Sequence, residues 1–362
     1  MKIMTILGTR PEIIRLSVII KKLDQYCDHI LVHTGQNFDK KLSSIFFNEL
    51  RLREPDHYLA VKNTTIGGQI GKIIIESEKV ILKEKPDRLL ILGDTNSGLT
   101  AIVAKRMGIP VFHMEAGNRC FDNKVPEEVN RKIIDHASSI FLPYTYRSKE
   151  NLIQEGIPNK DIFVIGNPIY EVMEHYTKEI NHSTILDKLA LKHKQFFLVT
   201  MHRAENVDNE ERLKNLLTSL NVLKSKYGFP IICSLHPRTR SKMDHFMITP
   251  TNDNIHFSDP LGFFDFVFLE KNALCIVTDS GTVQEESCIL KIPNITIRDV
   301  TERPETIESG SNMLTSVSSN LIENAVDIVL REKRKWEPPK EYLEKDVSST
   351  VIKIILGYNT IL

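Results

Sequence analysis

Three acidic side chains in the N-terminal half stand where short apolar runs end. Asp94 follows the run RLLILG, Glu115 closes the run PVFHME, and Glu127 lies at the start of a helix-like segment. Ligands of parallel α/β sheets bind outside the carboxyl ends of the strands. Carboxylates that share such a site raise one another's pKa, as general acid and base catalysis requires. The three side chains are therefore candidate catalytic carboxylates.

Simpler structural roles remain open for the same stretch of sequence. Asp94 could cap the helix that follows it, and Glu128 suits the first turn of a helix because a carboxylate there offsets the helix dipole. Arg119 and Arg131 could be partners of the carboxylates or could form ordinary salt bridges. The position of the acidic residues after strands is what favours chemistry over capping.

Basic side chains at other strand ends are candidates for binding an anion. Arg10 stands at a predicted helix N-terminus, where a cation is unfavourable unless an anion is shared there. His202 and Arg203 follow the run FFLVTM, and His236 follows the run PIICSL. A lone histidine is more often structural, but the location of His202 after a strand favours a role in the site. His236 is expected to face an anion or solvent.

The segment VTDSGTVQEES gives the strongest indication of a phosphate site. Ser280, Gly281 and Thr282 lie between a predicted strand and a predicted helix, so their backbone N–H groups can hold a phosphate at the helix N-terminus. Glu286, one turn into that helix, could reach ribose hydroxyls. The alternative is a plain capping turn. Arg303, in the following segment IRDVTERPE, adds positive charge.

Strand-like and helix-like segments alternate along the chain. The strand-like runs are residues 2–7, 29–34, 88–93, 110–115 and 139–144, then 196–201, 230–235, 255–259, 275–280 and 294–299. The longest helix-like segments are residues 12–26, 65–85, 97–107, 128–138 and 210–227. Strict alternation predicts parallel sheets with right-handed crossovers, and two series of strands predict two sheets. The expected fold is therefore α/β, with two doubly wound domains facing a cleft.

Three parts of the chain are expected. Residues 1–170 form a domain that carries the acidic residues, and residues 171–345 form a domain that binds phosphate. Residues 346–362 form a last helix that packs back on the first domain. The polar stretch 177–194 is weakly patterned, which predicts a connector.

Composition excludes several classes of function. Lys+Arg and Asp+Glu number 47 each, so nothing suggests a broad nucleic-acid or polybasic membrane surface. The five cysteines are scattered without a CxxC pair, which argues against a zinc site or disulfide framework and favours a cytoplasmic protein. The N-terminus lacks the apolar length of a signal peptide, and no apolar run approaches the roughly 20 residues of a membrane span.

Two cofactor motifs that the sequence suggests at first sight are incomplete. The stretch GGQIGK lacks the spacing of a phosphate-binding P-loop, and no GxGxxG follows any predicted strand. ATP and a nicotinamide cofactor are therefore unsupported, and no cofactor or metal is expected.

Seven segments together resemble a known family. GTRPE, GDTNS, HMEAGNR, VPEEVNR, MHRAEN, DSGTVQEE and RDVTERPE are similar, in order and spacing, to the motifs of the non-hydrolysing UDP-N-acetylglucosamine 2-epimerases. The resemblance covers essentially the whole chain. It implies a glycosyltransferase-B-like fold of two Rossmann-type domains, a homodimer, and an epimerase that needs neither metal nor nicotinamide.

The resemblance also implies roles for individual residues. Asp94, Glu115 and Glu127 match the acidic catalytic residues, and His202 matches the histidine that supports the UDP leaving group. The matching substrate- and UDP-binding positions are Arg10, Arg15, Phe266, Ser280, Gly281, Thr282, Glu286 and Arg303. Of these, Arg15 replaces a lysine of the family, and Phe266 aligns with an aromatic residue near uracil.

Some segments depart from the family pattern. HRAE replaces HRRE, and residues 35–39 read GQNFD where allosterically regulated members have histidine and arginine. Strong activation by UDP-N-acetylglucosamine is therefore not expected. The short segment AGNRCFDNKVPEE is closer to the branch that acts on UDP-N-acetylated 6-deoxy-L-hexosamines. The substrate is thus UDP-N-acetylglucosamine or a 6-deoxy-L-hexosamine equivalent.

The clustered carboxylates suit a reaction that breaks the C1–O bond first. The C2 proton of an acetamido sugar has no adjacent carbonyl to acidify it, so UDP must leave before a base can remove that proton. Reprotonation on the opposite face and return of UDP complete the epimerisation. A hydrolysing epimerase, a glycosyltransferase of the same fold and a non-catalytic UDP-sugar sensor are the alternatives.

Overall fold

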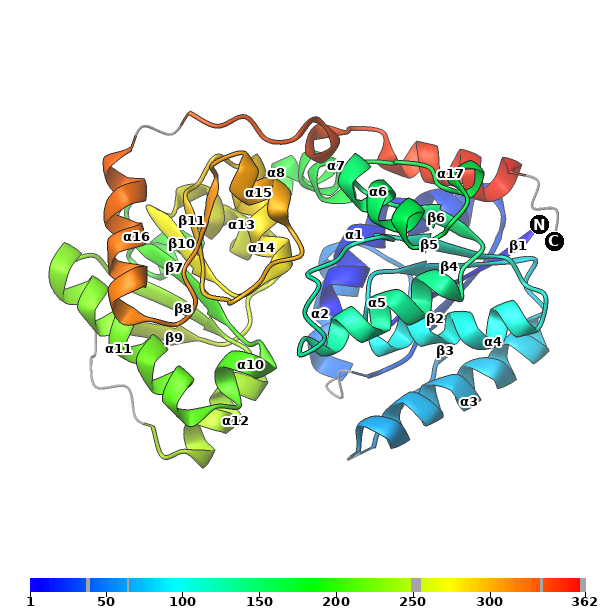
Figure 1. Ribbon diagram of the computed structural model, residues 1–362, viewed down its shortest axis with the longest axis horizontal. Helices are drawn as coiled ribbons and strands as arrows, with labels where there is room; N and C mark the ends of the chain where they lie inside the picture. The colour runs from blue at the N-terminus through cyan, green and yellow to red at the C-terminus, as the bar shows by residue number, and fades with distance from the viewer. Residues whose placement is uncertain (37–39, 64, 249–254, 333–334, 359–362) are drawn as a thin grey trace. The chain divides into compact units, whose positions relative to one another are not determined.

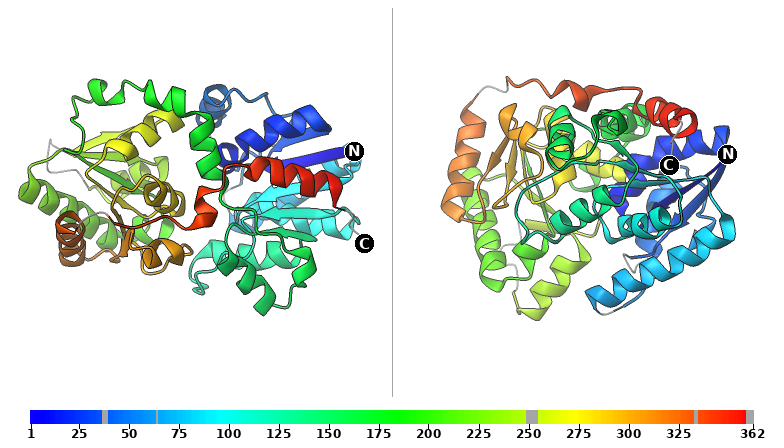
Figure 2. Two further views of the ribbon diagram at one scale, coloured as in Figure 1. Left: turned by 90° about the horizontal axis from the view of Figure 1, so that it is seen from above. Right: turned by 45° about the vertical axis from the view of Figure 1, so that its right-hand side comes forward.

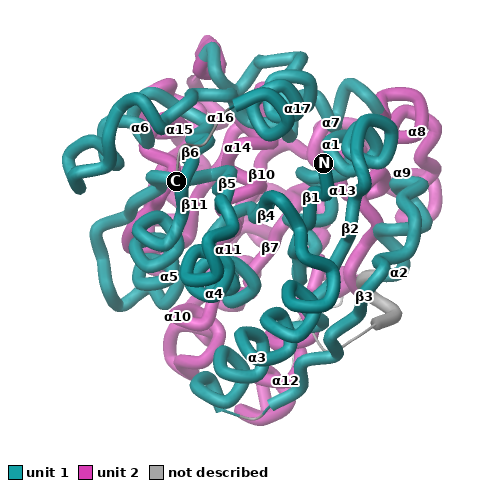
Figure 3. The backbone as a smooth tube through the Cα atoms, turned by 90° about the vertical axis from the view of Figure 1, so that its right-hand side faces the viewer, with its two compact units in different colours: residues 1–175, 340–362 teal, residues 176–339 magenta. Residues whose placement is uncertain are grey.

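The computed structural model describes residues 1–36, 40–63, 65–248, 255–332 and 335–358 of the 362-residue chain. The chain divides into two compact units, shown in different colours in Figure 3. Unit 1 comprises Met1–His175 and Lys340–Leu362, and unit 2 comprises Tyr176–Pro339. Unit 2 is therefore inserted between the main part of unit 1 and its last segment.

Unit 1 contains a parallel six-stranded sheet with the order β3-β2-β1-β4-β5-β6 (Figure 1). The strands are β1 (Lys2–Leu7), β2 (Asp28–His33), β3 (His57–Tyr58), β4 (Arg88–Leu92), β5 (Val111–Met114) and β6 (Ile140–Leu142). The order reverses direction between β1 and β4. In a doubly wound sheet this switch point is where ligands bind.

The helices of unit 1 connect these strands. They are α1 (Arg10–Tyr26), α2 (Lys40–Glu49), α3 (Ile66–Glu84), α4 (Ala101–Arg106), α5 (Pro126–His136), α6 (Tyr146–Gln154), α7 (Pro168–His175) and α17 (Val347–Gly357). The described residues also form the short 3₁₀ helices η1 (Asn96–Thr100), η2 (Asn159–Asp161) and η3 (Lys340–Leu343). Helix α1 begins with a capping box, in which Thr9 caps the helix and Glu12 binds back to the cap.

Unit 2 repeats the strand order of unit 1. Its parallel sheet has the order β12-β11-β10-β7-β8-β9, so its switch point lies between β7 and β10. The strands are β7 (Phe197–Met201), β8 (Ile231–Leu235), β9 (Ile255–Ser258), β10 (Cys275–Thr278), β11 (Asn294–Thr296) and β12 (Asn312–Leu314). The helices are α8 (Thr177–Asn181), α9 (Ile185–Lys188), α10 (Ala204–Val207), α11 (Glu210–Tyr227), α12 (Pro237–His245), α13 (Phe263–Asn272), α14 (Gly281–Ile289), α15 (Pro304–Glu308) and α16 (Ser319–Arg331).

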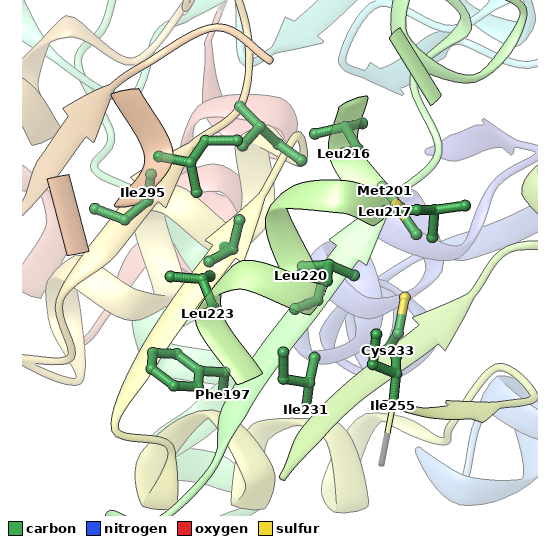
Figure 4. Close-up of a cluster of buried hydrophobic side chains, with 14 of the residues drawn as sticks. Phe197, Met201, Leu216, Leu217, Leu220, Leu223, Ile231, Cys233, Ile255 and Ile295 are labelled. Carbon is green, nitrogen blue, oxygen red and sulfur yellow. The ribbon is translucent and has the colours of Figure 1, made fainter. Parts of the chain in front are cut away.

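Buried apolar strands form the core of each unit. All residues of β4, β7 and β8 are buried, as expected for strands of a parallel sheet covered by helices on both faces. In unit 2, Leu220 and Leu223 of α11 pack against Phe197 of β7 and Ile231 of β8 (Figure 4). The strand ends are therefore held on rigid elements.

The structure confirms the two parallel sheets and corrects several details. The short edge strands β3 and β12 were not predicted, because neither lies in an apolar run of the kind that marks the other strands. The predicted helix 97–107 begins as the 3₁₀ helix η1 before it continues as α4. The expected connector 177–194 is wrong: it contains α8 and α9, whose Ile180 and Ile185 are buried.

Helix α17 belongs to unit 1 although it follows unit 2 in the chain. It packs against α1 and α7, as the left view of Figure 2 shows for the red helix. Ser348 at its first turn donates its backbone N–H to Glu171 of α7 (2.7 Å). Arg88 of β4 donates to the backbone carbonyls of Ile355 and Tyr358 at the end of the helix. In the described part of the chain, no helix has the length and apolarity needed to span a membrane.

Ile355→Ala should lower the free energy of unfolding by about 2–5 kcal/mol, because it leaves a cavity under α17. Ile355 is fully buried, whereas Ile328 on α16 is 49% exposed and serves as the matched control. Denaturant unfolding of both alanine variants measures the difference. We expect Ile328→Ala to change stability by no more than about 0.5 kcal/mol. Equal losses in the two variants would contradict the packing of α17.

Candidate active site

Unit 1 places Asp94 and Glu115 at the ends of neighbouring strands. Leu92 of β4 pairs with Met114 of β5, and the two carboxylates follow these paired residues. Because β4 and β5 are parallel, both acids emerge at the same edge of the sheet. The sequence-predicted pair is therefore brought together in one region of unit 1.

Asp94 is held by groups from helix α5. Arg131 donates from Nε to Asp94 Oδ2 (2.9 Å), and the Asn130 amide donates to the Asp94 backbone carbonyl (3.0 Å). Arg131 also pairs through Nη1 with Glu128 (2.6 Å). The open question about Arg131 is thus answered: it is a salt-bridge partner of the candidate catalytic carboxylate.

Glu115 is held by a buried arginine. Arg15 of α1 forms an ion pair with Glu115 Oε2 at 2.5 Å, and both side chains are buried. The Asn118 amide donates to the other oxygen (3.1 Å). Glu115 itself has a left-handed backbone conformation, with φ of 66°. Non-glycine residues in this region are uncommon and cluster at functional sites.

Arg15 was predicted to bind substrate, but its contacts in unit 1 are those of an orienting group. Besides the Glu115 pair, its guanidinium carbon lies 5.6 Å from the centre of the Tyr144 ring. The planar guanidinium can serve a carboxylate and an aromatic face together, which a lysine could not do in the same way. Within unit 1, Arg15 fixes the direction of Glu115.

Glu127 and Arg10 lie at helix N-termini of the same unit. Glu127 is half-buried in the first turn of α5, after Pro126. Arg10 is the first residue of α1, and its guanidinium carbon lies 5.8 Å from the centre of the Phe46 ring. The segment 35–39, for which no allosteric activation is expected, lies partly outside the described residues, because residues 37–39 are not described.

Glu12, a buried residue in the first turn of α1, links two turns of the site. Its Oε2 accepts the backbone N–H groups of Gly8 (2.5 Å) and Thr9 (2.7 Å), and its Oε1 accepts the Thr95 hydroxyl (2.6 Å). Burial raises the pKa of Glu12 to about 7, although these hydrogen bonds lower it. Glu12 therefore joins the β1–α1 turn to the residue next to Asp94.

A second buried carboxylate, Asp135 of α5, supports the loop after β5. It accepts from Gly117 N–H (3.1 Å), pairs with His113 (2.8 Å) and pairs with Arg119 (2.8 Å). Burial opposes ionisation, but the hydrogen bond from His113 and the charges of His113 and Arg119 hold the pKa of Asp135 below its usual value. Arg119 also donates two hydrogen bonds to Glu155 (2.8 and 2.6 Å). Its contacts are therefore those of a structural salt bridge.

In unit 2, His202 follows β7 and is oriented by Asp279, which follows the neighbouring strand β10. The His202 Nδ1 atom lies 3.1 Å from Asp279 Oδ1. Asp279 also accepts the backbone N–H groups of His202 (2.9 Å) and Arg203 (3.0 Å) and the Asn206 amide (3.1 Å). Burial would raise the pKa of Asp279, but the charge of His202 and these donors lower it to about 2. The prediction for His202 missed this partner, although Asp279 stands directly before Ser280.

The predicted phosphate loop forms the N-terminus of α14. Ser280 is the residue before the helix, and its hydroxyl lies 2.9 Å from the Thr282 hydroxyl. A Cβ atom at Gly281 would lie 2.7 Å from Glu302 Oε1, so the absence of a side chain leaves room for this carboxylate. Glu302 in turn pairs with Arg298 (2.8 Å).

Arg303 lies in the same neighbourhood, because β11 is the strand next to β10. Its Nε atom donates to Glu285 of α14, and both side chains are buried. Glu286, the predicted ribose ligand, is a buried residue of the same helix. The structure thus brings the loop, Arg303 and Glu286 together around α14.

Two further predicted binding residues, Phe266 and His236, also lie in unit 2. Phe266 of α13 is only 8% exposed and packs with Phe196, Leu198 and Leu269 in an apolar cluster of unit 2. In this structure it is a core residue. His236 caps α12 by accepting the Arg238 N–H (3.2 Å), and its ring centre lies 5.8 Å from that of His202. Across the described residues, no group of three His, Cys, Asp or Glu side chains could hold a metal ion.

Comparisons with known proteins identify one family over nearly the whole chain. The sequence model of the family described as UDP-N-acetylglucosamine 2-epimerase matches residues 21–356. The UDP-N-acetylglucosamine 2-epimerase of Methanocaldococcus jannaschii is 45% identical over 348 residues, which cover 94% of this chain and 95% of that protein. The UDP-2,3-diacetamido-2,3-dideoxy-D-glucuronate 2-epimerase of Pseudomonas aeruginosa is 36% identical over 325 residues, 89% of this chain and 90% of that protein.

Solved structures of the same family also match this chain. The M. jannaschii UDP-GlcNAc 2-epimerase in complex with UDP-GlcNAc and UDP has a TM-score of 0.94 at 43% identity, covering 98% of this chain and 99% of that chain. MurG of Acinetobacter baumannii, 11% identical with a TM-score of 0.54, shares the fold alone. The expected glycosyltransferase-B-like class of two parallel sheets is confirmed.

The buried Glu12 carboxyl predicts a pH-dependent stability. Its folded-state pKa of about 7 exceeds the ordinary value of 4.5. Its stabilising contribution is therefore fully present below pH 4.5 and is lost as the pH rises through 7. In Glu12→Gln this loss should vanish, so the wild-type curve should fall relative to the variant by at most about 1.4 kcal/mol per pH unit. Denaturant unfolding from pH 4.5 to pH 8 measures both curves, and parallel curves would contradict the assignment.

Proposed function

We propose that this chain, which belongs to the UDP-N-acetylglucosamine 2-epimerase family, inverts the configuration at C2 of a UDP-linked N-acetylhexosamine. The observation that carries the proposal is the pair Asp94 and Glu115, which end adjacent strands and are each held by an arginine. Acid and base groups fixed in this way suit proton removal from one face of a carbon and proton return to the other.

UDP-N-acetylglucosamine is the proposed substrate, with UDP-N-acetylmannosamine as the product. Support comes from the names of relatives that match nearly the whole chain, including the 45% identical protein of M. jannaschii. The 36% identical P. aeruginosa relative is named for a different UDP-sugar, so the sugar varies among proteins of this similarity. The 6-deoxy-L-hexosamine equivalents therefore belong in the same substrate panel.

The proposed reaction proceeds by elimination and re-addition of UDP. The C1–O bond breaks and its electron pair leaves with UDP. A carboxylate then takes the C2 proton, and the electron pair of the C2–H bond forms the C1–C2 double bond of a glycal. Protonation at C2 from the opposite face and attack of UDP on C1 restore the nucleotide sugar with inverted configuration.

The residues divide between the two needs of this reaction. Asp94, Glu115 and Glu127 in unit 1 supply the acid and base groups. In unit 2, His202 stabilises the departing UDP, since the buried Asp279 carboxylate holds its ring. The N–H groups at the start of α14 hold the diphosphate.

Binding of UDP and assembly complete the proposal. Arg10 and Arg303 contribute charge to the nucleotide sugar, and Glu286 binds its ribose. The enzyme works in the cytoplasm as a homodimer without a metal or nicotinamide cofactor. All five cysteines are free thiols, in keeping with a reducing compartment. Apolar residues Ile75 and Leu82 on α3 are exposed and offer a surface for a second copy.

Arg303→Ala should weaken UDP binding by about 1–3 kcal/mol, because a charge-assisted contact to the diphosphate is lost. Isothermal titration calorimetry with UDP measures the change. Arg331→Ala is the matched control, since Arg331 lies at the end of α16 with its side chain 81% exposed. Unchanged affinity in Arg303→Ala would argue against this use of the α14 region.

Turnover in deuterium oxide should place one deuteron at C2 of the product, without NAD or added metal. Asp94→Asn, Glu115→Gln and Glu127→Gln should each slow turnover by at least roughly 100-fold, the usual loss when a general acid or base is removed. NMR of a panel of UDP-N-acetylhexosamines follows both the label and the sugar.

Three results would count against elimination and re-addition. These are epimerised product without solvent deuterium, activity that appears only with added NAD, and accumulation of free N-acetylmannosamine. The last would indicate a hydrolysing epimerase instead.

A further inference from the structure

Glu128 is a fully buried carboxylate that neither the reaction nor the UDP site uses. It lies in the first turn of α5, next to Glu127. Its two oxygens accept the backbone N–H groups of Cys120 (3.0 Å) and Phe121 (3.1 Å) and the Nη1 donor of Arg131 (2.6 Å). A helix-capping role alone would not explain these contacts, because two of the donors lie in the loop before the helix.

The loop that Glu128 holds is strained and exposed. Phe121 has a left-handed backbone, with φ of 57°, and its side chain is 71% exposed. Such a conformation is unfavourable for a residue with a Cβ and persists only where surrounding contacts enforce it. The two N–H groups bound by Glu128 lie on either side of the Cys120 α-carbon, so Glu128 fixes the turn that leads into Phe121.

Glu128 is also connected to Asp94, because Arg131 binds both carboxylates. Arg131 uses Nη1 for Glu128 and Nε for Asp94 Oδ2, at 2.6 and 2.9 Å. The guanidinium is a rigid planar fork, so fixing one donor fixes the direction of the others. Glu128 thus determines where Arg131 points, and Arg131 determines how Asp94 is held.

We propose that Glu128 is a positioning residue that couples the 118–125 loop to the Asp94 carboxylate through Arg131. The inference rests on the proposed function, because it takes Asp94 as an acid or base group. Glu128 is not itself the proton carrier. Its oxygens already accept hydrogen bonds from three N–H donors, and taking a proton would release the loop and Arg131 together.

The first test is a double-mutant cycle with Glu128→Gln and Asp94→Asn. Glu128→Gln should lower kcat by roughly 10–100-fold through misplacement of Asp94, with KM little changed because UDP is held by unit 2. In the Asp94→Asn background the same change should add almost nothing, since residues that act as one unit are non-additive. Glu150→Gln, an exposed acid on the neighbouring α6, is the control and should leave kcat unchanged.

The outcomes separate this inference from the proposed function. Full activity of Asp94→Asn would overturn the assignment of Asp94 and the inference with it. A large loss in Asp94→Asn, followed by an equal further loss in the double variant, would overturn the inference alone. If Glu128→Gln does not fold, Arg131→Lys replaces it in the cycle. Lysine keeps the charge but cannot bind Glu128 and Asp94 as a fork, so it should show the same non-additivity.

A second measurement is independent of activity. The Cys120 sulfur lies 3.4 Å from Glu128 Oε2 and 3.7 Å from Arg131 Nη1. In Glu128→Gln the thiolate of Cys120 keeps the positive neighbour and loses the negative one. Alkylation of Cys120 by iodoacetamide, followed by mass spectrometry, should therefore become several-fold faster than in wild type and in Glu150→Gln. An unchanged rate would show that Glu128 does not hold this loop in solution.

Discussion

A buried charge is stable only when a partner of opposite charge or several hydrogen-bond donors meet it, and this constraint organises both units. At the carboxyl edge of unit 1, Arg15 meets Glu115 and Arg131 meets Asp94. Around α14 in unit 2, Arg303 meets Glu285 and Arg298 meets Glu302. Asp94 and Glu115 are therefore each held in one direction before substrate arrives, which reduces the reorganisation that the reaction requires.

The two units use the same sheet order for different chemistry. Each sheet changes direction between its first and fourth strands, and candidate residues follow both of those strands. In unit 1 they are Arg10 after β1 and Asp94 after β4. In unit 2 they are His202 after β7 and Ser280 after β10. The same architecture thus presents candidate acids in one unit and a candidate anion-binding helix terminus in the other, in keeping with the rule that a common fold can carry different sites.

The ends of parallel strands can be predicted from sequence, because an apolar run followed by polar residues is recognisable without a structure. This pattern selected Asp94, Glu115, His202 and the turn before α14 as candidates, and the structure places each of them just after a strand. The pattern could not reveal contacts between segments far apart in the chain. Arg15 and Glu115 are 100 residues apart, and Asp279 lies 77 residues after His202, so no local pattern joins either pair. The burial of Phe266 was not predicted either, because the sequence of a helix rich in aromatic residues does not show which ring faces the core.

The insertion of unit 2 within unit 1 has a consequence for biosynthesis. Helix α17 covers α1 and α7, and Val351 and Ile355 on it are fully buried. During translation, α1 leaves the ribosome early but must wait for α17 to cover its apolar face. Unit 2 is contiguous in sequence and can finish folding first. The part of the chain that carries the candidate acids is thus synthesised first and completed last, and apolar surface that stays exposed during folding is prone to aggregation.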